Sequence, residues 1–461
     1  MLKPISDSPL YGGPPGPAFP LHYNVEPPVN LLSLQLFAEG GHPYAAYAKM
    51  RDEAPVCWHP SGDPGEPGFW ALTRHADIRA ASLDTTTFSS QKGGILIGYG
   101  PPEQRHPQLF KASVDTMICL DAPAHIQLRK EHMPFFTPAH VAALKVKVDE
   151  KVTALLDNAL AALDGKAERL AASAKLPEGQ IDLVEYISAE LPLFTLSEIL
   201  GVPEVDRPKL VAWMHYLEIA GDTMTRLRGG AEMTAEDMNF FGIFMGEVDA
   251  MLAYGRAILQ QRRREPQPDL LSAIAHMTVD GDLLSDEYLD GSWLLIVFAG
   301  NDTTRNSISG TMKLLTESPA AKARVIADPS LLPNMVEEAI RCVTPVIHMR
   351  RTAVRDTELG GQKIAEGEKI VMWYGAANRD PRVFADPDVF DVMRKNAGEH
   401  LAFGMGAHIC IGKRVAQMQL ESAYRQILAR APDLGYAGGI DIAPNNFVVA
   451  IRGLPVSLGS R

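Results

Sequence analysis

Between residues 133 and 275, apolar residues recur at three- and four-residue spacing. This spacing places them on one face of an α-helix. We therefore expect helices over 138–163, 183–200 and 234–263. Residues 221–230 combine glycines with threonines and arginines, and they predict a flexible connection between two of these helices.

The longest helical pattern covers residues 286–318. Asp286 and Glu287 fall in its first turn, where acids complement the helix dipole, and Pro319 marks its end. At 1.5 Å per residue such a helix is roughly 50 Å long. A helix of that length must cross the middle of the protein.

A strand pattern follows this long helix. Apolar residues alternate over 351–374 around the turn-forming pair Gly360–Gly361. Residues 379–400 are expected to be irregular, and a last helix is expected from near Gly412 to about Ala431. The fold class predicted is mostly α with a minor β region.

Composition supports one large folded unit. Hydrophobic residues make up 46% of the 461 residues, which is ample for a large core. Residues 1–30 are rich in proline and glycine and predict an extended arm or loop. No internal boundary is visible after them, so we expect residues 31–461 to form a single domain.

Charge, hydropathy and cysteine content narrow the functional classes. A net charge of −12 argues against nucleic acid as a partner. The most apolar run, 293–299, is much shorter than the ~20 residues that span a bilayer, and the N-terminus lacks the apolar core of a signal peptide. The four cysteines contain no CxxC pair, which disfavours disulfides and structural zinc. We expect a soluble, cytoplasmic protein without a membrane anchor.

The segment FGMGAHICIG, residues 403–412, carries the most specific chemical signal. Gly404 and Gly406 allow a tight loop that can press against a flat cofactor. Cys410 ends the loop, and the predicted helix that follows offers unpaired N–H groups and partial positive charge. Both favour a thiolate over a thiol. A lone cysteine in such a place is more often buried and inert, so the whole loop carries the prediction.

Residues 299–304, AGNDTT, are poor helix-interior residues inside the long helix. Gly300 leaves room for a ligand, and the Thr303 hydroxyl can bond an upstream carbonyl and distort the helix. Asp302 beside that hydroxyl can relay protons. The alternative is a polar stripe on a solvated face, which the flanking run WLLIVF disfavours.

These segments resemble the cytochrome P450 family. The loop 403–412 matches the family signature FGxGxHxCxG at every fixed position, Ala416 also matches, and 299–304 is similar to (A/G)GxDTT. The resemblance implies the P450 fold, with the long central helix lying over haem b. It also implies that Cys410 is the axial ligand of the iron, and a thiolate in that position favours O–O cleavage.

This resemblance also implies roles for two further motifs. Glu338 and Arg341 match ExxR and share a helix face; alone they would be read as a surface ion pair. In the family this pair meets an arginine before the cysteine loop, a place that Arg394 matches, and its role is structural. Residues 121–129 resemble DxPxHxxxR, and Arg and His can donate hydrogen bonds to carboxylates. The implied partners of the haem propionates are His125, Arg129, Arg351 and His408.

The resemblance implies a monooxygenase that uses O₂ and receives electrons from a separate ferredoxin and its reductase. Lys413 and Arg414 are candidates for ferredoxin docking, or simply solvated side chains. Segments 299–307, 348–353 and 357–380 look like the bacterial branch that hydroxylates alkane and fatty-acid chain ends. That is the first substrate expected; a terpenoid, steroid or aromatic hydrocarbon is the alternative. The loop 93–118 should help form the distal wall of the site, but it does not match that branch well.

The substrate pocket is expected to be largely apolar. Family positions, helix phase relative to Thr303 and loop composition predict as its lining Ile95, Leu96, Ile97, Leu295, Phe298, Ala299, Val346, Ile347 and Phe447. Two rival functions are a peroxide-driven peroxygenase and a haem sensor or carrier. The Asp302–Thr303 pair disfavours both, because neither needs a proton relay.

Overall fold

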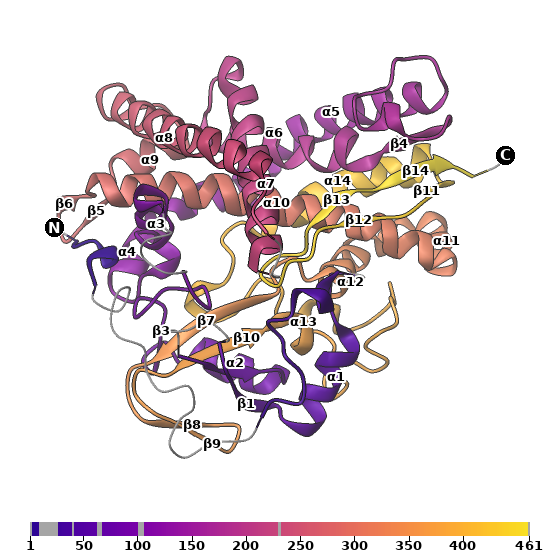
Figure 1. Ribbon diagram of the computed structural model, residues 1–461. Coiled ribbons are helices and arrows are strands. Elements are labelled where there is room, and N and C mark those ends of the chain that lie inside the picture. Colours follow the sequence, from indigo (N-terminus) through magenta and orange to yellow (C-terminus); the bar gives the residue numbers. More distant parts are fainter. Residues whose placement is uncertain are drawn as a thin grey trace.

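The computed structural model describes residues 2–8, 26–38, 41–61, 67–99, 106–228 and 232–459. A helix-rich part lies beside a smaller β-rich part (Figure 1), which confirms the predicted fold class. The helices are α1 Tyr44–Glu53, α2 His75–Leu83, α3 Pro107–Val114, α4 Ala124–His132, α5 Pro138–Leu163, α6 Glu190–Leu200, α7 Arg207–Arg228, α8 Ala235–Arg264, α9 Leu270–Ala275, α10 Asp286–Glu317, α11 Pro319–Ala327, α12 Leu332–Val343, α13 Tyr374–Ala377 and α14 Lys413–Arg430.

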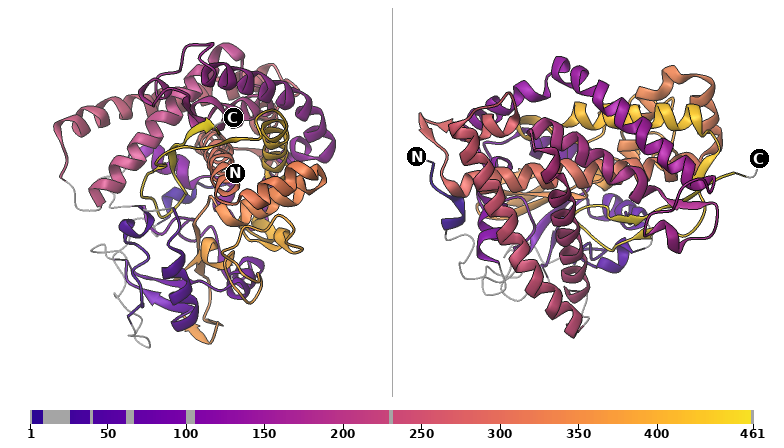
Figure 2. Two further views of the ribbon diagram at one scale, coloured as in Figure 1. Left: turned by 90° about the vertical axis from the view of Figure 1, so that its right-hand side faces the viewer. Right: turned by 90° about the horizontal axis from the view of Figure 1, so that it is seen from above.

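The long helix α10 crosses the helix-rich part and contacts α3, α6, α8, α12 and α14 (Figure 1). Its bounds agree with the prediction to one residue, and those of α5, α8 and α14 agree equally well. Helices α7 and α8, rose-coloured in Figure 2, extend outward from the rest of the helices. Within the part of the chain that is described, no helix has the length and hydropathy needed to cross a bilayer.

Three local predictions were wrong. Helix α7 continues through Gly221 to Arg228, where we expected a flexible connection from residue 221; a helix tolerates one glycine at a cost of about 1 kcal/mol. The predicted helix 183–200 opens with a π-type turn, Val184–Ser188, before α6. Part of the expected loop 93–118 is α3, because the His106 side chain accepts a hydrogen bond from the Leu109 N–H and proline occupies the first helical position.

The β-rich part is built on one sheet of five strands in the order β1-β2-β10-β7-β3. Strand β10 runs parallel to β2 and antiparallel to β7, pairing Lys369 with Thr352. The predicted turn at Gly360–Gly361 joins β8 to β9, and both glycines have positive φ. The strands are β1 Val56–His59, β2 Phe69–Leu72, β3 Phe88–Ser89, β4 Gln180–Asp182, β5 Thr278–Val279, β6 Asp282–Leu283, β7 His348–Ala353, β8 Thr357–Leu359, β9 Gln362–Ile364, β10 Lys369–Trp373, β11 Leu434–Tyr436, β12 Asp441–Ile442, β13 Ile451–Gly453 and β14 Pro455–Leu458.

The first residues of the chain pack against the helix-rich part. Ile5 is buried in the main hydrophobic core. The Ser6 N–H and hydroxyl both donate to the Asp115 carboxylate, at 3.0 and 2.6 Å, and the Tyr288 hydroxyl donates to the carbonyl of Lys3. The predicted arm therefore begins with an anchored segment, while its residues 9–25 lie outside the described residues.

Candidate active site

The cysteine loop places a deep thiol beside an open space. Gly404 and Gly406 adopt φ of 66° and 73°, and the Cys410 N–H donates to the Phe403 carbonyl at 2.8 Å. The Cys410 side chain is exposed, yet burial raises its pKa, and hydrogen bonds from the Gly412 and Lys413 N–H groups only partly offset this. The N–H groups at the start of α14 therefore act to lower the thiol pKa, as expected, but burial outweighs them. A bound metal cation would supply the missing stabilisation of the thiolate.

The predicted propionate ligands come together as a cluster of cationic and titratable groups. The His125 and His408 rings stack at 4.0 Å between centroids. Burial and the neighbouring arginines lower the pKa of His125 to about 4 and that of His408 to about 2. Arg351 is buried and contributes to both shifts. Arg129 donates to the Ile409 carbonyl at 2.6 Å, which ties α4 to the cysteine loop.

This cluster has the character of an anion site. The nearby acid, Asp121, already accepts hydrogen bonds from Ser89 and Ser90. The Nδ1 atom of His408 is buried and has no hydrogen-bond partner among the described residues. Carboxylates placed here would receive charge-assisted hydrogen bonds and would relieve the mutual repulsion of the cationic groups. The residues present therefore fit a group that carries carboxylates, such as the propionates of haem.

On α10, Asp302 and Thr303 both line one cavity. The Thr303 hydroxyl donates to the Ala299 carbonyl at 3.1 Å, as predicted from the residue type, but the helix stays unbroken through this segment. Asp302 is buried and forms an ion pair with Arg305, which also pairs with Glu218 of α7. A chain of charges therefore connects the proposed proton relay to α7.

Gly300 lies where α10 meets α6, and the room for a ligand that we predicted beside it stays a prediction. A Cβ atom built on this residue would lie 2.9 Å from the Cδ1 atom of Leu196. The missing side chain lets α6 pack closely against α10.

The cavity has a volume of about 460 Å³. It includes all of the predicted lining residues except Ile97 and Ile347. Ile347 is completely buried in the core, and Ile97 packs against the same core. Segment 93–118, which we expected to help form the distal wall, contributes lining residues that the sequence analysis did not name individually: Tyr99, His106, Leu109, Phe110, Ala112, Ser113, Thr116 and Ile118.

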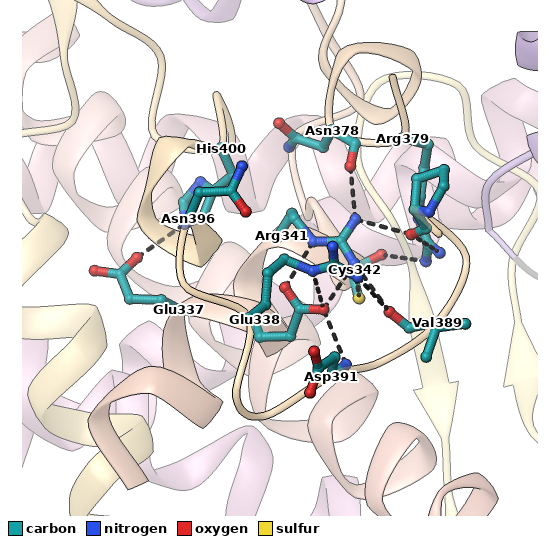
Figure 3. Close-up of polar contacts among 12 residues, drawn as sticks. Glu337, Glu338, Arg341, Cys342, Asn378, Arg379, Val389, Asp391, Asn396 and His400 are labelled. Carbon is teal, nitrogen blue, oxygen red and sulfur yellow. Dashed lines mark hydrogen bonds and ion pairs between the residues drawn. The ribbon is translucent and has the colours of Figure 1, made fainter. Parts of the chain in front are cut away.

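Glu338 and Arg341 meet in the interior (Figure 3), and Arg394 joins them there. The Glu338 carboxylate accepts from Arg341 Nε at 2.7 Å, from Arg341 Nη2 at 2.8 Å and from Arg394 Nε at 2.9 Å. Arg341 also donates to the carbonyls of Asn378 and Pro387. The network therefore fastens α12 to the irregular segment that leads into the cysteine loop.

Comparison with known proteins gives this geometry its context. The sequence model of the family "Cytochrome P450" matches residues 235–430. Linalool 8-monooxygenase of Pseudomonas putida is 34% identical over 90% of this chain and 95% of its own length. The chain belongs to the cytochrome P450 family. A methyl-branched lipid omega-hydroxylase of Mycobacterium tuberculosis is 32% identical over 89% of this chain and 90% of its own.

The fold comparison agrees with this assignment. The structure of a Mycobacterium marinum cytochrome P450 in complex with pseudoionone superposes with a TM-score of 0.80 at 32% identity, covering 96% of this chain and 100% of the other. The protein is therefore a bacterial-type P450 monooxygenase that catalyses hydroxylation with a haem-thiolate cofactor, O₂ and redox partners.

Proposed function

We propose that this P450 holds haem b through Cys410 and hydroxylates an unactivated C–H bond at the end of a branched, apolar chain. The observation that carries the proposal is the pairing of a deep, accessible thiol with an Asp–Thr pair in the wall of an apolar cavity. When bound, haem supplies the activation of dioxygen and the insertion of one oxygen atom.

In this proposal, one group of residues binds the haem and another delivers protons. His125, Arg129, Arg351 and His408 hold the propionates by charge-assisted hydrogen bonds. The Thr303 hydroxyl, which now donates to a carbonyl of its own helix, can turn to hold a proton on its Oγ1 in the cavity. The Asp302 carboxylate passes protons to that hydroxyl. To do so it must loosen its ion pair with Arg305.

The character of the cavity supports an apolar substrate. Its lining among the described residues contains no lysine or arginine that would pair with a carboxylate. The hydroxyls of Ser113 and Thr116 lie in the wall and can bond one neutral oxygen function. Linalool and pseudoionone, named for two similar proteins, are acyclic, branched molecules with one such function. We therefore place an acyclic terpenoid first and an alkane or fatty-acid chain end second, which reverses the order that the sequence favoured.

We propose a ferredoxin as the electron donor. Arg129 ties α4 to the loop of Cys410, so the exposed side chains of Lys130 on α4 and Arg414 on α14 flank that loop. Positive charge there suits an acidic protein partner.

Three measurements test this function. The reduced protein with carbon monoxide should show the red-shifted Soret band of a thiolate ligand, and a histidine-type band or none would refute Cys410 as the ligand. Titration with acyclic terpenoids, alkanes and fatty acids should give the largest spin-state change for a terpenoid. Product formed in step with NADH and dependent on ferredoxin would exclude a peroxygenase and a sensor.

The variant Phe298→Ala connects substrate preference to the cavity. Phe298 lines it from α10, and removal of its ring should weaken terpenoid binding by roughly 10-fold or more, because burial of an aromatic side chain contributes about 1.5–3 kcal/mol. Leu314→Ala on the same helix, outside the cavity lining, is the matched control. Equal affinity in the Phe298 variant would show that the substrate binds elsewhere.

A further inference from the structure

Glu337 and Glu338 are neighbours on α12, but their carboxylates have different partners. Glu338 belongs to the buried network with Arg341 and Arg394. Figure 3 shows Glu337 reaching away from that network toward His400. None of the roles assigned so far uses Glu337.

The Glu337 carboxylate contacts residues on both sides of the cysteine loop. On the upstream side, His400 Nε2 lies 3.0 Å from Glu337 Oε2. On the downstream side, Gln417 donates a short hydrogen bond to Glu337 Oε1, and the Lys413 ammonium lies 3.6 Å from the same oxygen. One carboxylate on a rigid helix therefore joins the entry and the exit of the segment that carries Cys410.

The contacts upstream fix the state of His400. The Ala402 N–H donates to its Nδ1 at 3.2 Å, so the hydrogen of the neutral ring is on Nε2 and points to Glu337. Burial lowers the pKa of His400, which keeps the ring neutral. The His400 ring also packs on Phe403, with 5.6 Å between the centroids, and Phe403 is the residue whose carbonyl binds the Cys410 N–H.

The contacts downstream lead directly to the sulfur. The Lys413 N–H is one of two backbone groups that donate to Cys410, and the Lys413 ammonium lies 5.3 Å from the Phe403 ring centroid. Burial acts to raise the pKa of Glu337, but the His400 hydrogen bond and the Lys413 charge outweigh it and the pKa is lowered. The carboxylate is thus ionised at neutral pH and neutralises a lysine beside the thiolate position. This also removes Lys413 from the residues free to meet a ferredoxin.

We infer that Glu337 is a positioning residue for the thiolate: it fastens both ends of the cysteine loop and cancels the charge of Lys413 next to the sulfur. The inference rests on the proposed function, in which Cys410 is the iron ligand. Two consequences follow. Without the carboxylate, the uncancelled lysine charge should raise the reduction potential of the iron, and the loosened loop should lose the thiolate form more readily.

The test compares Glu337→Gln with Glu421→Gln in the haem-loaded protein. Glu421 lies on α14, is half-buried and pairs with Arg425 3.9 Å away. The readouts are the reduction potential and the rate at which the carbon monoxide complex changes from a thiolate-type to a thiol-type Soret band. We expect Glu337→Gln to raise the potential and to speed this change about 10-fold, as expected for the loss of one charge-assisted hydrogen bond, while Glu421→Gln matches the unsubstituted protein.

Adding Lys413→Met to Glu337→Gln separates the charge effect from general loosening. The double variant should return the potential to near its original value, and a double variant that keeps the full shift would overturn the inference. So would a Glu337 variant that matches Glu421→Gln in both readouts. If Glu337→Gln does not take up haem, His400→Leu provides the test, because leucine has no donor for Glu337 and breaks the upstream contact alone. This variant should speed the band change without the full rise in potential, and an unchanged rate would refute the inference. A missing thiolate band in the unsubstituted protein would instead refute the proposed function.

Discussion

Replacement of Glu338 by glutamine tests the buried charge network with a defined magnitude. Both Glu338 oxygens accept from Arg341, at 2.7 and 2.8 Å, and both side chains are completely buried. In either orientation of a glutamine, its NH₂ group must face a guanidinium donor. Two buried arginines also lose their counter-charge, because Arg394 shares the same carboxylate. Breaking a buried pair in this way costs about 3–5 kcal/mol.

The expected effect can be expressed as a melting temperature. Unfolding entropy is about 2.1 cal/mol/K per residue near 60 °C, so a chain of 461 residues loses roughly 1 °C for each kcal/mol. We expect Glu338→Gln to lower Tm by about 3–5 °C, measured by far-ultraviolet circular dichroism on haem-loaded protein. Glu317→Gln, which removes an exposed pair with Lys313, should shift Tm by less than about 1 °C.

A double-mutant cycle completes this test. Because Arg394 and Arg341 share one carboxylate, Arg394→Met combined with Glu338→Gln should cost less than the sum of the two single changes, by about 1–3 kcal/mol. A Glu338→Gln protein that melts like the Glu317 control would refute the reasoning, as would strict additivity in the cycle.

Three further predictions follow from the site. Asp302→Asn should reduce product formation about 100-fold while substrate binding, followed by the spin-state change, stays the same; an unchanged turnover would show that the protons take another route. His348 is buried and its pKa is lowered to about 4, so the unfolded state binds more protons below pH 6.5. The free energy of unfolding should therefore fall by up to roughly 3 kcal/mol as the pH drops from 6.5 to 4, and Tm should fall with it. His348→Gln should flatten the slope of Tm against pH. Charge reversal at Lys130 and Arg414 should slow reduction by ferredoxin about 10-fold at low ionic strength, and a rate that does not depend on salt would contradict docking at this face.

The sequence predicted best where local patterns decide the structure. The long helix 286–317 and the turn at Gly360–Gly361 depend on periodicity and turn chemistry within a short window. The meeting of Arg394 with Glu338 is different. It joins residues 56 positions apart, and only the family resemblance indicated it, because spacing along the chain carries no information on such a contact.

The packing details that the sequence did not predict have a common physical cause. Gly300 is a small residue in a motif, and the sequence cannot show that Leu196 from another helix occupies the space beside it. Ile347 follows the cavity residue Val346 in the sequence, but its side chain is completely buried in the core. Helix α3 is only eight residues long and is held by tertiary packing, which outweighs weak intrinsic propensity. Which face of an element meets which neighbour is decided by packing.

The anchored start of the chain has a practical consequence for protein production. Asp115 directly follows α3, the helix that contributes much of the cavity wall, and its carboxylate is held by Ser6. Removal of the first few residues should therefore alter ligand titrations without touching any residue of the cavity.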